Sequence, residues 1–232
     1  MKQLAFAIIG SLLFLASCNK DEDEVTVVGD VYVVSQLSGE DVVYGLSIHA
    51  YSLDAFASVT VNSNSDPGVT YHLEAYPGFK TDFYYDTPED ELSTEKPVTG
   101  TYHFTATFES GEVLTDDDVL ATDVLIPPVI KTSDYDVTNS KAVVEWETVT
   151  GADLYVIKLY DDDELVFLSP AIDPNYKKVE FTSGSSSWGQ EYVPVAGTSF
   201  KLVLSAFKYE TNGDSYNVQA STSNESTLIW GE

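Results

Sequence analysis

The sequence predicts an all-β protein made of two tandem antiparallel β-sandwiches. Its 232 residues include fifteen Tyr but one Met, and they are rich in Val and Thr, which with the aromatic residues favour strands over helices. Short alternating runs are separated by turn-forming residues at the spacing of a sandwich. The pair Pro127-Pro128 cannot join a β-ladder and is predicted to be a stiff hinge between residues 25–126 and 129–232.

The first half contains seven runs predicted to be strands. They are Val25–Ser35, Val42–Tyr51, Ala57–Asn62, Val69–Tyr76, Thr81–Tyr85, Gly100–Ser110 and Val119–Leu125. The clearest is the sixth run, where Tyr102, Phe104 and Phe108 share one face, as in a half-buried strand. The segment Gly100–Thr107, followed by Ser110-Gly111-Glu112, resembles a late strand of bacterial Ig-like surface modules. This resemblance implies an Ig-like sandwich over residues 25–126.

The second half has the same alternation. Trp146 lies in AVVEWETVTGADLYVIKLY, a long strand follows in GTSFKLVLSAFKYE, and Asn212-Gly213-Asp214 is a hairpin signal. With Pro128 at its entry, this half resembles a fibronectin type III domain. Phe200 occupies the position at which that family has a hydrogen-bonding tyrosine, and the segment 170–196 is long for the fold. The resemblance implies a binding scaffold or spacer in residues 129–232 rather than a particular chemistry.

The amino terminus is expected to direct export. Lys2 is followed by an apolar run, Leu4–Ala16, which is too short to span a bilayer and is typical of a signal peptide. The run ends in Leu15-Ala16-Ser17-Cys18, which resembles a bacterial lipobox. It implies a signal peptide over residues 1–17 and acyl chains such as palmitate on Cys18, the single cysteine. The alternative is an ordinary signal peptide that ends near a cysteine.

An acidic segment follows the cysteine. Residues 18–24, Cys-Asn-Lys-Asp-Glu-Asp-Glu, resemble the surface-export signal of outer-membrane lipoproteins in gut anaerobes. The resemblance implies a lipid-anchored protein of the outer membrane that faces the cell exterior, whereas the alternative is a solvated spacer. The lipid anchor would be the contact with the membrane.

The net charge of the sequence limits the classes of partner that the protein can bind. The formal net charge is −27, and all eleven basic residues are lysine. Nucleic acid is therefore not expected as a partner, because its phosphates need a basic footprint. An anionic membrane surface would repel the body of the protein. Uncharged glycans, cationic partners and divalent cations remain compatible with this charge.

The candidate ligand-binding residues are aromatic. Trp188 lies in a Ser- and Gly-rich stretch, where it would either stack on a sugar ring or partner or fold back over the end of the sandwich. Tyr84 and Tyr85 belong to a cluster after Pro77-Gly78, for which strand packing is the alternative. No cofactor is expected.

Histidines and acidic runs are the candidates for metal or catalytic sites. His72 and His103 could share one outer surface and bind zinc, or be exposed polar residues. The runs Asp116–Asp118 and Asp161–Glu164 lack the spacing of a calcium loop, and solvated loops are the alternative. No nucleophile or phosphate-loop pattern is present in the sequence.

These observations predict a non-enzymatic cell-surface lipoprotein that acts as a binding, adhesion or accessory module. Its partner would be a glycan or an outer-membrane protein. The alternatives are a structural spacer or pilus-type assembly subunit and, in a third class, a glycoside hydrolase with two facing carboxylates.

Overall fold

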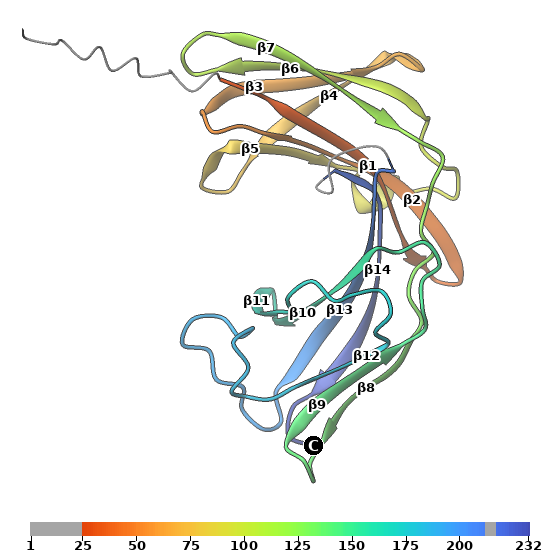
Figure 1. Cartoon of the computed structure of the whole chain (residues 1–232), viewed down its shortest axis with the longest axis vertical. Helices are drawn as coiled ribbons and strands as arrows, with labels where there is room; N and C mark the ends of the chain where they lie inside the picture. The colour runs from red at the N-terminus through yellow and green to blue at the C-terminus, as the bar shows by residue number, and fades with distance from the viewer. Residues whose placement is uncertain (1–24, 212–216) are drawn as a thin grey trace, which may run out of the picture.

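The computed structural model describes residues 25–211 and 217–232, which form fourteen strands and one short 3-10 helix (Figure 1). In chain order the elements are β1 (Val28–Ser38), β2 (Asp41–Tyr51), β3 (Phe56–Ser63), β4 (Asp66–Tyr76), β5 (Phe79–Asp86), η1 (Glu89–Glu91), β6 (Gly100–Phe108), β7 (Val113–Leu120), β8 (Ile130–Asp136), β9 (Lys141–Trp146), β10 (Leu154–Asp161), β11 (Glu164–Leu168), β12 (Lys178–Phe181), β13 (Ser199–Tyr209) and β14 (Val218–Ile229). The all-β prediction is confirmed.

Some predictions fall outside the described residues. These are the signal peptide over residues 1–17, the lipid site Cys18, the acidic tether 18–24 and the hairpin at Asn212–Asp214. Within the described part of the chain, no helix has the length and hydrophobicity needed to span a bilayer.

Two hydrophobic cores occupy the two halves. The first gathers side chains between Val27 and Leu120, and the second gathers side chains between Leu125 and Trp230. In the first half, β1, β2 and β5 lie over β3, β6 and β7, and β4 pairs with both β5 and β3. In the second half, β11, β10, β13 and β14 cover the small sheet β12-β9-β8. Each half is therefore a two-layered β structure with a core of its own.

The boundaries of one predicted strand were wrong. The sequence predicted a strand over Val119–Leu125, but β7 covers Val113–Leu120 and includes the acidic run Asp116–Asp118. In β7, Asp116 and Asp118 turn toward β1, where they accept hydrogen bonds from the Gly29 and Val31 amides at 2.8 and 2.7 Å. The acidic run thus lies in a strand in which Asp116 and Asp118 accept backbone hydrogen bonds and Asp117 contacts His103.

A parallel strand pair joins the two halves into one sheet. Val33, Val34 and Ser35 of β1 lie opposite Ala220, Ser221 and Thr222 of β14, so eleven strands form a continuous sheet in the order β11-β10-β13-β14-β1-β2-β5-β4-β3-β6-β7. The buried side chains of Val33 and Ala220 are directly paired, so the two cores lie on the same side of this sheet.

The Pro127-Pro128 segment has contacts beyond those of a free hinge. Both prolines are buried, and the carbonyl oxygen of Pro128 accepts a hydrogen bond from Asn224 Nδ2 at 2.9 Å. Just before them, the Leu125 carbonyl accepts from Ser35 Oγ at 2.8 Å. The halves are thus held together by the linker and by the β1–β14 pair. The prediction of two domains joined only by a proline hinge did not include the β1–β14 pair.

Candidate ligand-binding face

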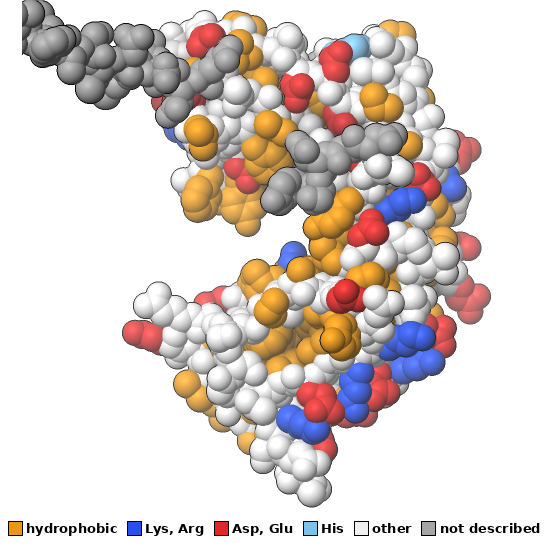
Figure 2. All heavy atoms as spheres, viewed as in Figure 1, with side chains coloured by type: hydrophobic (Ala, Val, Ile, Leu, Met, Phe, Trp, Pro, Cys, Tyr) orange, Lys and Arg blue, Asp and Glu red, His pale blue; other side chains and the backbone are white. Residues whose placement is uncertain are grey.

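The side of the continuous sheet that faces away from both cores is called the outward face here. Alternation along each strand decides which side chains reach it. In β1, Val31 and Val33 are buried in the core, so Tyr32 and Val34 point outward. In Figure 1, β3, β6 and β7 of the first half and β8, β9 and β12 of the second half lie on the core side of the sheet, away from the outward face. Figure 2 shows a hollow between the halves with hydrophobic side chains on both walls. The outward face lines this hollow.

Five aromatic side chains on the outward face make up the tyrosine–histidine row, defined as Tyr32, His49, Tyr51, Tyr76 and Tyr84. The His49 ring lies centrally, with centroids 5.7 Å from Tyr32, 5.7 Å from Tyr51 and 6.2 Å from Tyr84. Tyr76 extends the row from Tyr84 at 5.8 Å. The Tyr51 and Tyr76 side chains are 39% and 50% exposed, so the row presents aromatic surface to a ligand.

Hydrogen bonds assign the proton on His49. The Ser47 hydroxyl donates its one proton to Asp86 Oδ1 at 2.6 Å. The Ser47 oxygen therefore accepts from His49 Nε2, 3.0 Å away, with the Tyr32 hydroxyl 3.2 Å from the same nitrogen. Burial lowers the pKa of His49 despite the nearby Asp86 and Asp82 carboxylates, so the ring is neutral at pH 7. Its Nδ1 is then an acceptor, and this buried atom has no donor in the described residues.

Three aspartates surround the row. Asp30 is paired in register with His49 on β1 and β2, and Asp82 is paired with Tyr51 on β5 and β2. Asp86, at the end of β5, is held by Ser47. The buried oxygens Asp30 Oδ1 and Asp82 Oδ1 accept no hydrogen bond from described residues. Burial raises the pKa of both carboxyls, that of Asp30 to about 7.

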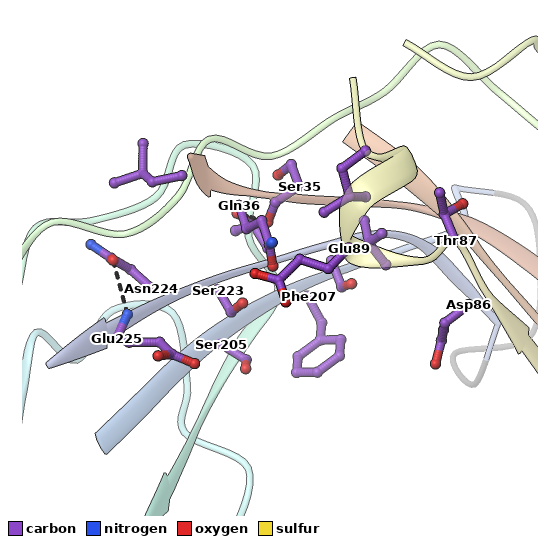
Figure 3. A pocket seen from close by; sticks show the side chains of 15 residues that line it. Ser35, Gln36, Asp86, Thr87, Glu89, Ser205, Phe207, Ser223, Asn224 and Glu225 are labelled. Carbon is purple, nitrogen blue, oxygen red and sulfur yellow. Dashed lines mark hydrogen bonds between the residues drawn. The ribbon is translucent and has the colours of Figure 1, made fainter. Parts of the chain in front are cut away.

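A pocket of about 540 Å³ opens on the outward face where the halves meet, and it is called the junction pocket (Figure 3). Side chains from β1, β13 and β14 form its floor, and the segment after β5 forms one wall. Its lining is rich in hydroxyl and amide groups, with Phe207 as its aromatic member. The polar lining residues are Ser35, Gln36, Asp86, Thr87, Glu89, Ser205, Ser221, Thr222, Ser223, Asn224 and Glu225.

A glycine allows the wall of this pocket to lie on the sheet. Gly45 of β2 is on the outward face, and a Cβ atom there would come within 2.5 Å of the Leu92 side chain and 2.7 Å of Thr87. Thr87 binds both backbone groups of Leu46 in β2, as a residue of a neighbouring strand would. Its Oγ1 accepts from the Leu46 amide at 2.8 Å, and its own amide donates to the Leu46 carbonyl at 2.9 Å. The wall thus depends on close backbone approach at Gly45.

The two predicted tyrosines separate onto opposite faces. Tyr84 points outward and joins the row, whereas Tyr85 packs beside Tyr71, at 5.0 Å, against the first core. Tyr32, His49 and Tyr51 were not among the ligand-binding residues predicted from the sequence. Alternation within two strands was their only signal, and because the other face of each strand is also apolar, the pattern does not distinguish the solvated face from the buried one.

Trp188 lies far along the chain from the row, in the second half. Its indole packs at 5.0 to 5.7 Å from Phe167, Tyr192, Phe200 and Trp230, and Nε1 donates to the Thr182 carbonyl at 2.9 Å. This packing matches the alternative in which Trp188 folds over the end of the sandwich. The structure does not bring Trp188 together with Tyr84, and ligand binding by Trp188 stays a prediction.

The histidine and acidic candidates are also separated. His103 Nδ1 contacts Asp117 Oδ1 at 2.5 Å, while His72 is exposed on β4. Among residues 25–211 and 217–232, no group of three or more His, Cys, Asp or Glu is placed to hold a metal ion. The solvated-loop interpretation was wrong for Asp118, which is 6% exposed and binds backbone amides.

No protein-family model matches the chain, and no curated protein matches it. Among solved structures, the chain is similar to the fibronectin(III)-like modules of CbhA from Clostridium thermocellum, with 10% identity, a TM-score of 0.29 and coverage of 88% of this chain and 94% of that chain. It is also similar to the BSP domain of a biofilm-associated protein, with 14% identity, a TM-score of 0.24 and coverage of 89% of this chain and 30% of that chain. Neither similarity assigns the chain to a family or a function.

Proposed function

We propose that the protein is a non-enzymatic, lipid-anchored surface module that binds a glycan along its outward face. The observation that carries this proposal is the tyrosine–histidine row beside the junction pocket, on one sheet shared by both halves. Aromatic rings offer apolar area for sugar rings, and convergent hydroxyl, amide and carboxylate groups orient a ligand through hydrogen bonds.

The anchor and the body have separate roles in this proposal. Acyl chains on Cys18 hold the protein in the outer membrane, the acidic residues 18–24 direct it to the cell exterior, and the Ig-like and fibronectin type III-like halves present the outward face. The net charge of −27 keeps the body away from anionic lipid headgroups. Protease shaving of whole cells tests this arrangement: the body should be cleaved on intact cells, and Cys18→Ser should release it from the membrane fraction.

The binding test is a glycan array followed by titration calorimetry on the full chain in detergent. Tyr84→Ala should weaken binding by about tenfold or more, because it removes a stacking ring from the row. Tyr176→Ala is the matched control, because Tyr176 is 62% exposed and lies outside the row. An array without hits, or equal affinities for the two variants and the unmodified chain, would exclude glycan binding by this face.

The geometry gives less support to a glycoside hydrolase. Three carboxylates line the junction pocket, those of Asp86, Glu89 and Glu225, and all three residues are exposed. A general acid needs a raised pKa, which usually comes from burial. Burial does raise the pKa of the Asp30 and Asp118 carboxyls, but neither residue lines the junction pocket and both accept backbone hydrogen bonds.

The geometry also gives less support to assembly by strand exchange. The first strand, β1, already pairs with the last strand, β14, so neither strand is a free partner for a strand of another chain. The terminal strand β7 of the large sheet carries the exposed Asp117, and a charged side chain on an edge opposes pairing with another chain. A monodisperse monomer across concentration in sedimentation velocity is the expected result.

A further inference from the structure

We propose that the ligand of the tyrosine–histidine row carries ammonium groups and is an oligosaccharide with free amino groups. This inference rests on the proposed glycan-binding function and narrows the class of glycan. Its basis is a mismatch on the outward face between the hydrogen-bond acceptors that are present and the donors that the chain supplies.

Three buried polar atoms in or beside the row have no hydrogen-bond partner in the described residues, and that of Asp30 is an acceptor when its carboxyl is ionised. They are Asp30 Oδ1, His49 Nδ1 and Asp82 Oδ1. The assignment of Nδ1 as an acceptor follows from the Ser47 hydroxyl, which donates to Asp86 and accepts from Nε2. Asp30 is only 4% exposed. Buried acceptors without donors are unfavourable, and a ligand that brings donors and positive charge would offset this.

The aspartates of this face have no cationic partner among the described residues. The lysines form their ion pairs with other carboxylates, for example Lys80 with Glu109 and Lys141 with Glu180. Asp30, Asp82 and Asp86 take part in none of the ion pairs found in the described part of the chain. Charges that are partly removed from water act over longer distances than exposed ones. Burial raises the pKa of Asp30 to about 7, so this group is mostly protonated at pH 6 and the negative charge at the row is that of Asp82 and Asp86. The row therefore presents aromatic rings beside two carboxylates that have no cationic partner in the described residues.

This combination suits an ammonium group. Cations are attracted to the faces of Tyr rings within about 6 Å of the centroid, and they also complement carboxylates. Such a contact occurs within the described residues, where Lys201 Nζ lies 5.0 Å from the centroid of the Tyr160 ring. At the row, the exposed rings of Tyr51 and Tyr76 are available for the same contact. A glycan with carboxylate or sulfate groups would be repelled by the same aspartates.

The test compares two oligosaccharides with the same sugar backbone, one with free amino groups and one with every amino group acetylated, and the salt dependence isolates the effect of charge. Titration calorimetry of the full chain, at a pH of about 6 where primary amines are protonated, uses a chitosan hexamer and the fully N-acetylated hexamer. The chitosan hexamer should bind about tenfold tighter, and its affinity should fall as salt is added. Asp82→Asn, which keeps the shape of the side chain, should weaken chitosan binding about fivefold or more and leave the neutral hexamer unaffected.

Asp134→Asn is the matched control, because Asp134 is exposed on β8 outside the row. Equal affinity for the two hexamers, or chitosan binding that is insensitive to both salt and Asp82→Asn, would overturn the inference while glycan binding stands. Binding of neither hexamer, together with an empty glycan array, would overturn the proposed function itself. Salt dependence is measured on the unmodified chain, so the test holds even if Asp82→Asn fails to fold.

Discussion

The Asp30 carboxylate in the first strand accepts a hydrogen bond from the Val218 amide in the last strand, at 3.2 Å. The two residues lie beside the short parallel pairing of β1 and β14 that joins the halves. Asp118 and Glu210 place further carboxyl groups near Asp30. Burial raises the pKa of Asp30 and of Glu210 to about 7 in each case. The junction between the halves is therefore built around carboxyl groups that hold protons well above their ordinary range.

Stability should depend on pH at this junction. A carboxyl whose pKa is raised on folding binds its proton more tightly in the folded chain, so its contribution is fully present below about pH 4 and is lost as the pH rises to about 7. Asp30→Asn keeps an oxygen for the Val218 amide and removes the charge. We expect it to raise the free energy of unfolding by about 1–2 kcal/mol at pH 8 and to change it little at pH 4.

Urea unfolding of both chains at the two pH values measures this difference, and comparison with the unmodified chain cancels the titration of the other carboxyls. A stability gain at pH 4 as large as that at pH 8 would show that proton binding by Asp30 is not its source.

Asp118 and Asp117, which are neighbours in β7, should contribute very differently to the free energy of unfolding. Asp118 accepts hydrogen bonds from the Val31 and Val119 amides, each at 2.7 Å. Asp118→Ala leaves the buried Val31 amide without its acceptor and should cost about 1–3 kcal/mol. Asp117→Ala removes an exposed contact with His103 and should cost less than about 1 kcal/mol. Thermal unfolding of both variants checks the contrast, and equal losses would contradict it.

Local sequence patterns predicted the strands well because alternation and turn residues act over a few positions. The pairing of Val33 with Ala220 has no local signal, because it joins segments from opposite ends of the chain in a parallel register. The tyrosine–histidine row was hidden for a related reason. Tyr32, His49 and Tyr84 come from three strands, and each strand taken alone is compatible with an aromatic side chain on either face. Asp118 looked solvated because its backbone partner lies 87 positions earlier in the chain.

The wall of the junction pocket can be tested at Gly45. A Cβ atom there would press on Leu92 and on Thr87, and overpacking of this kind costs about 1–3 kcal/mol. Gly45→Ala should displace the wall, weaken any ligand that occupies the junction pocket, and lower the free energy of unfolding. Hydrogen exchange at the Leu46 amide, whose acceptor is Thr87 Oγ1, should become faster. Unchanged exchange at Leu46 would mean that the wall adapts without leaving the sheet.

Substitutions of Trp188 should lower the stability of the protein without changing its affinity for a glycan. Its ring contacts four aromatic side chains of the second half, so Trp188→Ala should lower the free energy of unfolding by about 2–3 kcal/mol through lost packing. Trp188→Phe keeps much of that packing but loses the Nε1 hydrogen bond to Thr182, and an intermediate loss is expected. Glycan affinity should stay within about twofold in both variants, because Tyr84 and the row belong to the other half.

Chemical denaturation and titration calorimetry on the same samples measure the two effects of the Trp188 variants together. A folded Trp188→Ala variant with lost binding would make Trp188 a ligand contact, because its distance from the row leaves packing with no route to Tyr84. Retained binding with lowered stability would exclude Trp188 as a ligand contact and leave it as the aromatic cover of the second core.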